Sequence, residues 1–158
     1  MNKIDLSGRH AVVTGAAQGF GLAITDRLLA SDAKVSMWDI DGDELSGAAG
    51  SRDGATAVQG DVTDPASIDA GLKASRAANG PVDILVNNAG GILGLKDFLE
   101  VDESAWTETH RLNIQAPFFL AQQAFANMKK HGGGKIINIS SVIGQIGNSG
   151  QSLSLIHI

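Results

Sequence analysis

Five short runs of apolar and β-branched residues recur along the 158-residue chain, and longer stretches with helical character separate them. Runs this short and this uniformly apolar are typical of parallel strands whose sheet is covered on both faces. Strands that alternate with helices predict one doubly wound α/β sheet. The expected strands are His10–Thr14, Lys34–Trp38, Thr56–Gln59, Ile84–Asn87 and Ile136–Ser140.

The stretches between these runs predict four helices. Pro65 suits a first helical turn, and Asp64 before it is a suitable N-cap. The glycine-rich run HGGGK at 131–135 ends the last and longest helix and turns the chain into the fifth strand. The expected helices are Gly19–Ser31, Gly42–Ala49, Pro65–Asn79 and Glu103–Lys130.

Composition narrows the class of protein. A hydrophobic content of 43% and a charged content of 18% suit one globular domain with a core. A net charge of -5 argues against a nucleic-acid partner. The chain has no cysteine, and its four histidines lack metal-ligand spacing, so no metal is expected. No apolar run approaches the ~18 residues of a membrane helix, and the start lacks a signal peptide, so we expect a cytoplasmic protein.

A glycine-rich segment, TGAAQGFG at Thr14–Gly21, follows the first strand and opens the first helix. In this context a glycine turn lets a pyrophosphate approach backbone amides at the positive end of a helix. The spacing of Gly15, Gly19 and Gly21 is G-x-x-x-G-x-G, not the commoner G-x-G-x-x-G. A tight turn without a ligand is the alternative interpretation.

Asp39 ends the second strand, 18 residues after Gly21. A carboxylate near this offset accepts hydrogen bonds from the adenosine ribose and repels a 2′-phosphate. No lysine or arginine stands at positions 16, 17, 18 or 40 to attract that phosphate. We therefore expect NAD to be preferred over NADP. The alternative is that Asp39 only caps a loop that also holds Asp41 and Asp43.

Five motifs in this order, TGAAQGFG, GDVTD (60–64), NNAG (87–90), Asn113 and ISS (139–141), resemble the short-chain dehydrogenase/reductase family. The resemblance extends from Leu6 to Ser152. It implies a Rossmann-type, three-layer α/β/α fold and an NAD(P)-dependent oxidoreductase that acts on CH-OH groups of a small-molecule substrate. It also implies a parent protein that is a homodimer or homotetramer.

The resemblance assigns roles to individual residues. Asp61 and Val62 would contact the adenine ring, Asn88 to Gly90 would line the cofactor beside the central strand, and Asn87 would brace that turn. The cofactor-binding residues that it implies are Gly15, Gln18, Gly19, Phe20, Gly21, Asp39, Ile40, Asp61, Val62, Asn88, Ala89 and Gly90.

Two catalytic residues follow from the same resemblance. Ser141, just past the fifth strand, would hydrogen-bond the substrate oxygen, with Ser140 as its structural neighbour. Asn113 would anchor a water in a proton relay. Pro117, four residues later, lacks the amide hydrogen that would bond the carbonyl of residue 113, so a local kink is expected there. A packing kink without function is the alternative.

The family's acid/base tyrosine and its lysine are missing at the expected offsets, where Ser154 and Ile158 stand, and the chain has no tyrosine. A serine hydroxyl is too weak an acid for this role. Either a tyrosine-free descendant kept only nucleotide binding, or the chain is a piece of a longer gene. We expect the second, with an incomplete domain at 1–152. The tail LSLIHI, 153–158, is one translation of the transposon-end adapter CTGTCTCTTATACACATC.

The subfamily stays open at this point. GNSGQS at 147–152 looks like 3-oxoacyl-carrier-protein reductases, whereas Asp39 and the run after Gly90 depart from their pattern, so a sugar or polyol dehydrogenase is an equal candidate. Without a sixth strand on its outer side, the fifth strand would be an exposed apolar edge of the sheet. We therefore expect the chain as written to be inactive and to express poorly or bind NAD weakly.

Overall fold

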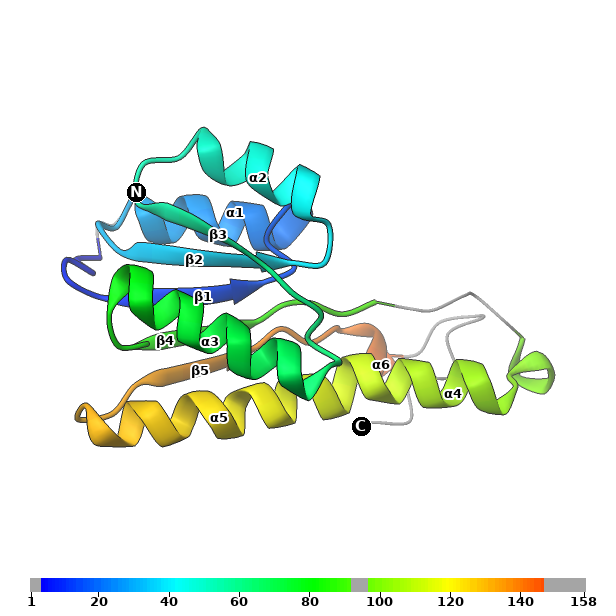
Figure 1. Cartoon of the computed structure of the whole chain (residues 1–158). Helices are drawn as coiled ribbons and strands as arrows, with labels where there is room; N and C mark the ends of the chain where they lie inside the picture. Colours follow the sequence, from blue (N-terminus) through cyan, green and yellow to red (C-terminus); the bar gives the residue numbers. More distant parts are fainter. Residues whose placement is uncertain (1–3, 92–96, 147–158) are drawn as a thin grey trace.

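A single parallel sheet organises the computed structural model, which describes residues 4–91 and 97–146 (Figure 1). Its strand order is β3-β2-β1-β4-β5, and every neighbouring pair is parallel. The strands are β1 (His10–Thr14), β2 (Lys34–Asp39), β3 (Ala55–Gln59), β4 (Ile84–Asn87) and β5 (Lys135–Asn138). The order reverses between β1 and β4, which is where sheets of this class bind ligands.

Helices cover both faces of the sheet, so the three-layer α/β/α fold is confirmed. Figure 1 shows α1 and α2 on one face and α3 and α5 on the other, with α4 extending the line of α5. The helices are α1 (Gly19–Leu29), α2 (Gly42–Gly50), α3 (Pro65–Asn79), α4 (Glu103–His110), α5 (Ala116–Lys130) and α6 (Ile143–Ile146). A 3-10 turn, Phe98–Glu100, precedes α4.

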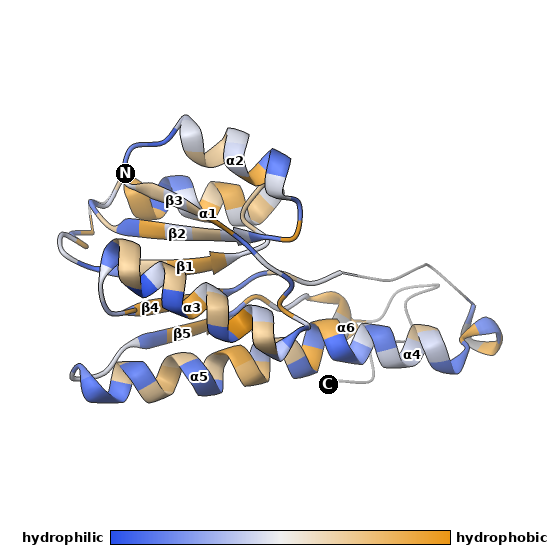
Figure 2. Cartoon of the chain, viewed as in Figure 1, coloured by the Kyte–Doolittle hydropathy of each residue, from blue (hydrophilic) through white to orange (hydrophobic). Residues whose placement is uncertain are grey.

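Alternating residues of the strands fill two separate cores. Val12 packs with Trp38 and Leu85 against α3 and α5, whereas Val13, one position later, packs against α1 and α2. This alternation explains the nearly continuous apolar runs, since both faces of each strand need apolar side chains. Figure 2 shows the apolar colour concentrated on the strands and the inner faces of the helices. The apolar residues of α1 packed on the sheet are Leu22, Ile24, Leu28 and Leu29.

Three helices begin with an aspartate cap. The Asp64 carboxylate accepts from the Ala66 amide at 3.0 Å, with Pro65 next, as the sequence predicts. Asp41 caps α2 and Asp102 caps α4 in the same way. Helix α1 differs, because its N-cap residue Gln18 makes no side-chain capping bond.

The long helix expected over Glu103–Lys130 is interrupted. A π-helical turn, Arg111–Gln115, separates α4 from α5 and ends just before Pro117. The missing amide hydrogen of this proline accounts for the change in hydrogen-bond spacing. The first helix also ends at Leu29, two residues before the expected end, and the last strand ends at Asn138 rather than Ser140.

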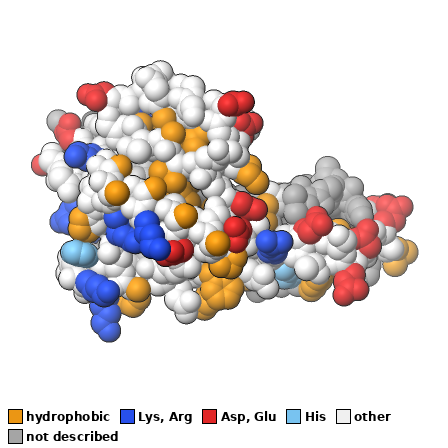
Figure 3. All heavy atoms as spheres, viewed as in Figure 1, with side chains coloured by type: hydrophobic (Ala, Val, Ile, Leu, Met, Phe, Trp, Pro, Cys, Tyr) orange, Lys and Arg blue, Asp and Glu red, His pale blue; other side chains and the backbone are white. Residues whose placement is uncertain are grey.

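Strand β5 lies at one edge of the sheet and all four of its residues are exposed. Ile137 is 46% exposed, as is Ile139 just beyond the strand, and Val142 is 62% exposed. Helix α5 likewise presents Phe118 and Phe125 to the outside. In Figure 3 apolar side chains gather on the surface over the start of α5. An exposed apolar edge was expected from the sequence.

Candidate functional site

A cleft of about 510 Å³ lies at the carboxyl ends of β1, β2 and β4. Its volume falls within the range of about 300–1,000 Å³ that small-molecule sites occupy. The residues that line it are Gly15, Gln18, Trp38, Asp39, Ile40, Gly60, Asp61, Val62, Thr63, Asn88, Ala89, Gly90, Glu108, Arg111 and Leu112.

The glycine turn (residues 14–21) needs glycine at two positions for different reasons. Gly15 has φ +63°, and a Cβ there would lie 3.1 Å from the Ala89 Cα. At Gly21 a Cβ would overlap the Gly15 carbonyl oxygen and lie 2.7 Å from Asn88 Nδ2. Helix α1 therefore begins in direct backbone contact with the turn, and Gly15 and Gln18 of the turn line the cleft.

The end of β2 holds this turn from one side. The Ala16 amide donates to the Trp38 carbonyl at 3.0 Å, and the Ala17 amide donates to Asp39 Oδ2 at 3.0 Å. Asp39 Oδ1 accepts from the Asp41 amide at 3.2 Å. Asp39 thus borders the cleft and also caps two backbone turns, so the two sequence interpretations of this residue are compatible.

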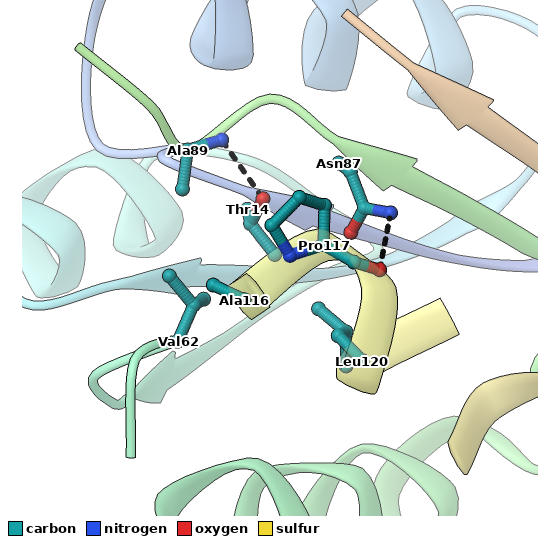
Figure 4. A pocket seen from close by; sticks show the side chains of 7 residues that line it. All are labelled: Thr14, Val62, Asn87, Ala89, Ala116, Pro117 and Leu120. Carbon is teal, nitrogen blue, oxygen red and sulfur yellow. Dashed lines mark hydrogen bonds between the residues drawn. The ribbon is translucent and has the colours of Figure 1, made fainter. Parts of the chain in front are cut away.

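The Thr14 side chain holds the turn from the other side, a role that no sequence pattern predicts. Its hydroxyl accepts from the Ala89 amide at 2.9 Å (Figure 4). It also accepts from the Asn88 amide at 3.0 Å and lies 3.4 Å from the Val86 carbonyl. Asn88 Nδ2 in turn donates a hydrogen bond of 2.9 Å to the Thr14 carbonyl. The carboxyl ends of β1 and β4 are therefore joined by hydrogen bonds next to Asn88 and Ala89, which line the cleft.

A third wall comes from the segment after β3. Asp61 Oδ1 accepts from the Thr63 amide at 2.8 Å and from the Thr63 hydroxyl at 2.7 Å, which shapes a tight turn beside Val62. Arg111 donates to the Thr63 carbonyl at 3.2 and 3.3 Å and closes this side. No sequence signal points to Arg111, because its partner lies 48 positions away.

Asn113 lies in the π-helical turn, and its side chain is fully engaged with backbone groups. Its Oδ1 accepts from the Gly91 amide at 3.0 Å, and its Nδ2 donates to the carbonyls of Gly91 and Thr109, both at 2.9 Å. A Cβ on Gly90 would approach Asn113 Oδ1 to 2.8 Å. The Asn113 amide therefore fixes the end of the NNAG segment against the helix.

Asn87 and Ser141 lie on the β5 side of the site. Asn87 Nδ2 donates to the Pro117 carbonyl at 3.3 Å (Figure 4) and to Asn138 Oδ1 at 2.8 Å. These bonds join β4 to α5 and to β5. Asn87 thus braces the strand ends. Ser141 is exposed beyond β5, and its Oγ accepts from the Ile143 amide at 3.2 Å.

The structure brings together most of the cofactor-binding residues implied by the resemblance. Those that line the cleft are Gly15, Gln18, Asp39, Ile40, Asp61, Val62, Asn88, Ala89 and Gly90. Gly19, Phe20 and Gly21 belong to the start of α1 instead, and the Phe20 side chain is 81% exposed. Asn113 and Ser141 are not among the lining residues. Positions 154 and 158 lie outside the described residues.

Within residues 4–91 and 97–146, no three His, Asp or Glu side chains gather closely enough to hold a metal ion. Over the same part of the chain, no helix has the length and apolar character needed to cross a membrane.

A glycine turn and a carboxylate at the end of the next strand, both beside a cleft at the topological switch point, form the arrangement in which doubly wound sheets bind nucleotides. The short chain dehydrogenase family model matches residues 9–153, and the chain belongs to that family.

Curated relatives include enzymes with different substrates. The chain is 37% identical over 160 residues to the 3-oxoacyl-(acyl-carrier-protein) reductase of Escherichia coli, covering 94% of the chain and 61% of the relative. It is 34% identical over 146 residues to the 2-dehydro-3-deoxy-L-rhamnonate dehydrogenase (NAD(+)) of a Sphingomonas species, covering 92% and 59%. Galactitol 2-dehydrogenase of Agrobacterium fabrum is 37% identical over 147 residues, with coverage of 91% and 57%.

A solved structure shares the fold. It is the crystal structure of the 3-ketoacyl-(acyl-carrier-protein) reductase from Brucella melitensis complexed with NADH, with a TM-score of 0.91 and 28% identity. The match covers 95% of this chain and 64% of that one. The chain thus spans about three fifths of the length of the relatives it matches.

Proposed function

We propose that the chain carries the nucleotide-binding part of an NAD-dependent oxidoreductase that transfers a hydride between nicotinamide and a secondary alcohol or ketone. The observation that carries this proposal is the cleft itself, lined by the glycine turn, the end of β2 and the NNAG segment. Gly15 and Gly21 have no Cβ, so the turn packs directly against Ala89 and the start of α1 packs directly against the turn, which shapes this wall of the cleft. The similar Brucella reductase was crystallised as a complex with NADH, which agrees with this chemistry.

The preference for NAD over NADP rests on Asp39. Its carboxylate borders the cleft, where it would accept from the ribose hydroxyls and repel a 2′-phosphate. Arg111 also lines the cleft, but its guanidinium donates to the Thr63 carbonyl. The name of the Sphingomonas relative, which includes NAD(+), supports the same choice.

Two residues of the chain would bind the substrate and the relay water. When bound, the nicotinamide supplies the site that gives or takes the hydride. Ser141 Oγ accepts a bond from the Ile143 amide, so its own hydrogen is left to donate to a substrate oxygen. The Asn113 side chain already forms hydrogen bonds with the backbone of Gly91 and Thr109. The group of Asn113 that would hold the relay water is therefore its main-chain carbonyl in the π-helical turn.

Two substrate classes follow from the relatives, a 3-oxoacyl thioester and a sugar or polyol. A small-molecule substrate agrees with the names of the Sphingomonas and Agrobacterium relatives. A homodimer or homotetramer remains a prediction for the parent protein, as does its cytoplasmic location.

A second candidate is a nucleotide-binding or regulatory module without catalysis. The lack of any tyrosine in the 158 residues favours it. Reading uninterrupted DNA beyond the codon of Gln151 decides between the two. A Tyr-x-x-x-Lys at 154 and 158 supports the enzyme, whereas an intact frame that encodes Ser154 and Ile158 supports the module.

Activity measurements then test the enzyme directly. The encoded protein should reduce a 3-oxoacyl thioester or oxidise a polyol with NAD as the better cofactor, and Ser141→Ala should lower kcat by about 10²-fold or more. Turnover that is unchanged in Ser141→Ala would contradict the assigned role.

A further inference from the structure

We infer that Asp39 is a positioning residue as well as a ribose ligand: its carboxylate holds the glycine turn in its binding shape before any cofactor arrives. The inference deepens the proposed function and rests on it for the identity of the ligand. Its first measurement needs no ligand, so the two can fail separately.

The contacts tie two successive amides of the turn to two successive residues of β2. Ala16 donates to the main chain of Trp38 at 3.0 Å, and Ala17 donates to the Asp39 side chain at 3.0 Å. The Asp39 carbonyl accepts from the Gly60 amide at 2.9 Å, which fixes Asp39 against the strand on its other side. The main chain that carries the Asp39 carboxylate is therefore held in place by strand pairing.

Burial makes the bond to Ala17 the more important of the two that Asp39 accepts. Ala17 is only 3% exposed, so water cannot easily replace a lost acceptor for its amide, and a buried donor without a partner is costly. Asp41 is exposed, and water can take over the bond to its amide.

The start of α1 needs a negative group that its own sequence does not provide. Helices α2, α3 and α4 each begin with an aspartate that accepts an amide hydrogen. The N-cap of α1, Gln18, makes no such bond, and its first turn has no acidic residue. Asp39 brings a carboxylate to this end from the neighbouring strand, where the helix dipole favours it.

Because Asp39 also holds the turn, a substitution at Asp39 should affect more than the choice between NAD and NADP. A carboxylate has about four acceptor positions, and two are occupied by Ala17 and Asp41, which leaves two for ribose hydroxyls. Removing the carboxylate would end its repulsion of a 2′-phosphate and also release the turn that holds the pyrophosphate. Affinity for NAD and for NADP should therefore both fall.

Amide hydrogen exchange of the cofactor-free, ¹⁵N-labelled chain tests the brace by NMR. In Asp39→Ala the Ala17 amide should exchange about 10-fold faster or more. In Asp39→Asn the side-chain oxygen should turn to the buried Ala17 amide, so that only the Asp41 amide loses protection. Asp43→Ala, in the same loop, is the control and should leave Ala17 unchanged. Equal Ala17 protection in wild type and Asp39→Ala would overturn the inference.

A ligand comparison separates positioning from ribose recognition. The probe is an NADH analogue whose adenosine ribose lacks both hydroxyls, so it offers Asp39 nothing to bind. Asp39→Ala should bind this analogue about 10-fold more weakly than wild type does, with rescue in Asp39→Asn. Equal affinity would overturn the inference. If wild type binds neither NADH nor the analogue, the proposed function fails and hydrogen exchange alone decides the role of Asp39.

Discussion

Replacing Gly21 with alanine should separate helix α1 from the glycine turn. The added Cβ would overlap the Gly15 carbonyl oxygen and lie 2.7 Å from both the Gly15 carbonyl carbon and Asn88 Nδ2. Carbon atoms in van der Waals contact lie about 3.5–4.0 Å apart, so the neighbouring backbone must retreat by about 1 Å. Backbone cannot rotate away as a flexible side chain can.

The cost follows from this displacement. Overpacking of a filled site costs about 1–3 kcal/mol, and the Asn88 bond to the Gly15 carbonyl would be lost as well, for about 1 kcal/mol more. A destabilisation near 3 kcal/mol lowers the Tm of a chain of this size by about 6–12 °C. Cofactor affinity should fall together with stability, because the displaced atoms belong to the turn.

Thermal unfolding followed by circular dichroism measures the effect. Gly47→Ala is the matched control: Gly47 lies in helix α2 with open space where the new Cβ would lie, so alanine there should stabilise the chain by about 0.4–1 kcal/mol. A Gly21→Ala variant that melts at the wild-type temperature, while Gly47→Ala behaves as expected, would show that the turn tolerates the added Cβ.

Three further predictions concern other parts of the molecule. Burial lowers the pKa of His10 below 6.5, so the unfolded chain binds more protons and stability should fall as pH drops below about 6.5, by at most about 1.4 kcal/mol per pH unit. Urea unfolding at several pH values should show a smaller slope in His10→Gln, and an identical slope would argue against this titration. Thr14→Val leaves two amides without their acceptor and should cost about 2–5 kcal/mol in urea unfolding, whereas Thr14→Ser should recover most of it; a Thr14→Val variant as stable as wild type would count against this. The exposed Ile137 and Ile139 should cause the chain to self-associate, which light scattering would detect, and lysine at both positions should reduce this association. A monomeric wild-type chain would contradict this prediction.

The strands and helices could be predicted closely because both sheet faces are buried. Residues of β1 alternate between two cores, so the apolar run stops where the strand stops. The Asp64 and Pro65 signals are local, and they fixed the start of α3. The split of the long helix was foreseen only as a kink near Pro117, because sequence does not show how the backbone recovers its hydrogen bonds.

Contacts between distant segments could not be predicted in the same way. The hydroxyl of Thr14 serves two amides just after β4 that lie more than 70 positions away, and a threonine at a strand end has no distinctive pattern. Arg111 reaches Thr63 because the long helix passes the segment after β3. Sequence reasoning treated ribose binding and loop capping as alternatives for Asp39, whereas the structure allows one carboxylate to do both.

An NMR titration of the 158-residue chain with NADH and with NADPH measures nucleotide binding at this cleft, because it detects even weak binding. Addition of NADH should shift the amide signals of Gly15, Ala17 and Asn88, and NADPH at the same concentration should shift them markedly less. A folded chain whose signals at these residues respond to neither nucleotide would contradict nucleotide binding at this cleft, and a stronger response to NADPH would contradict the preference for NAD.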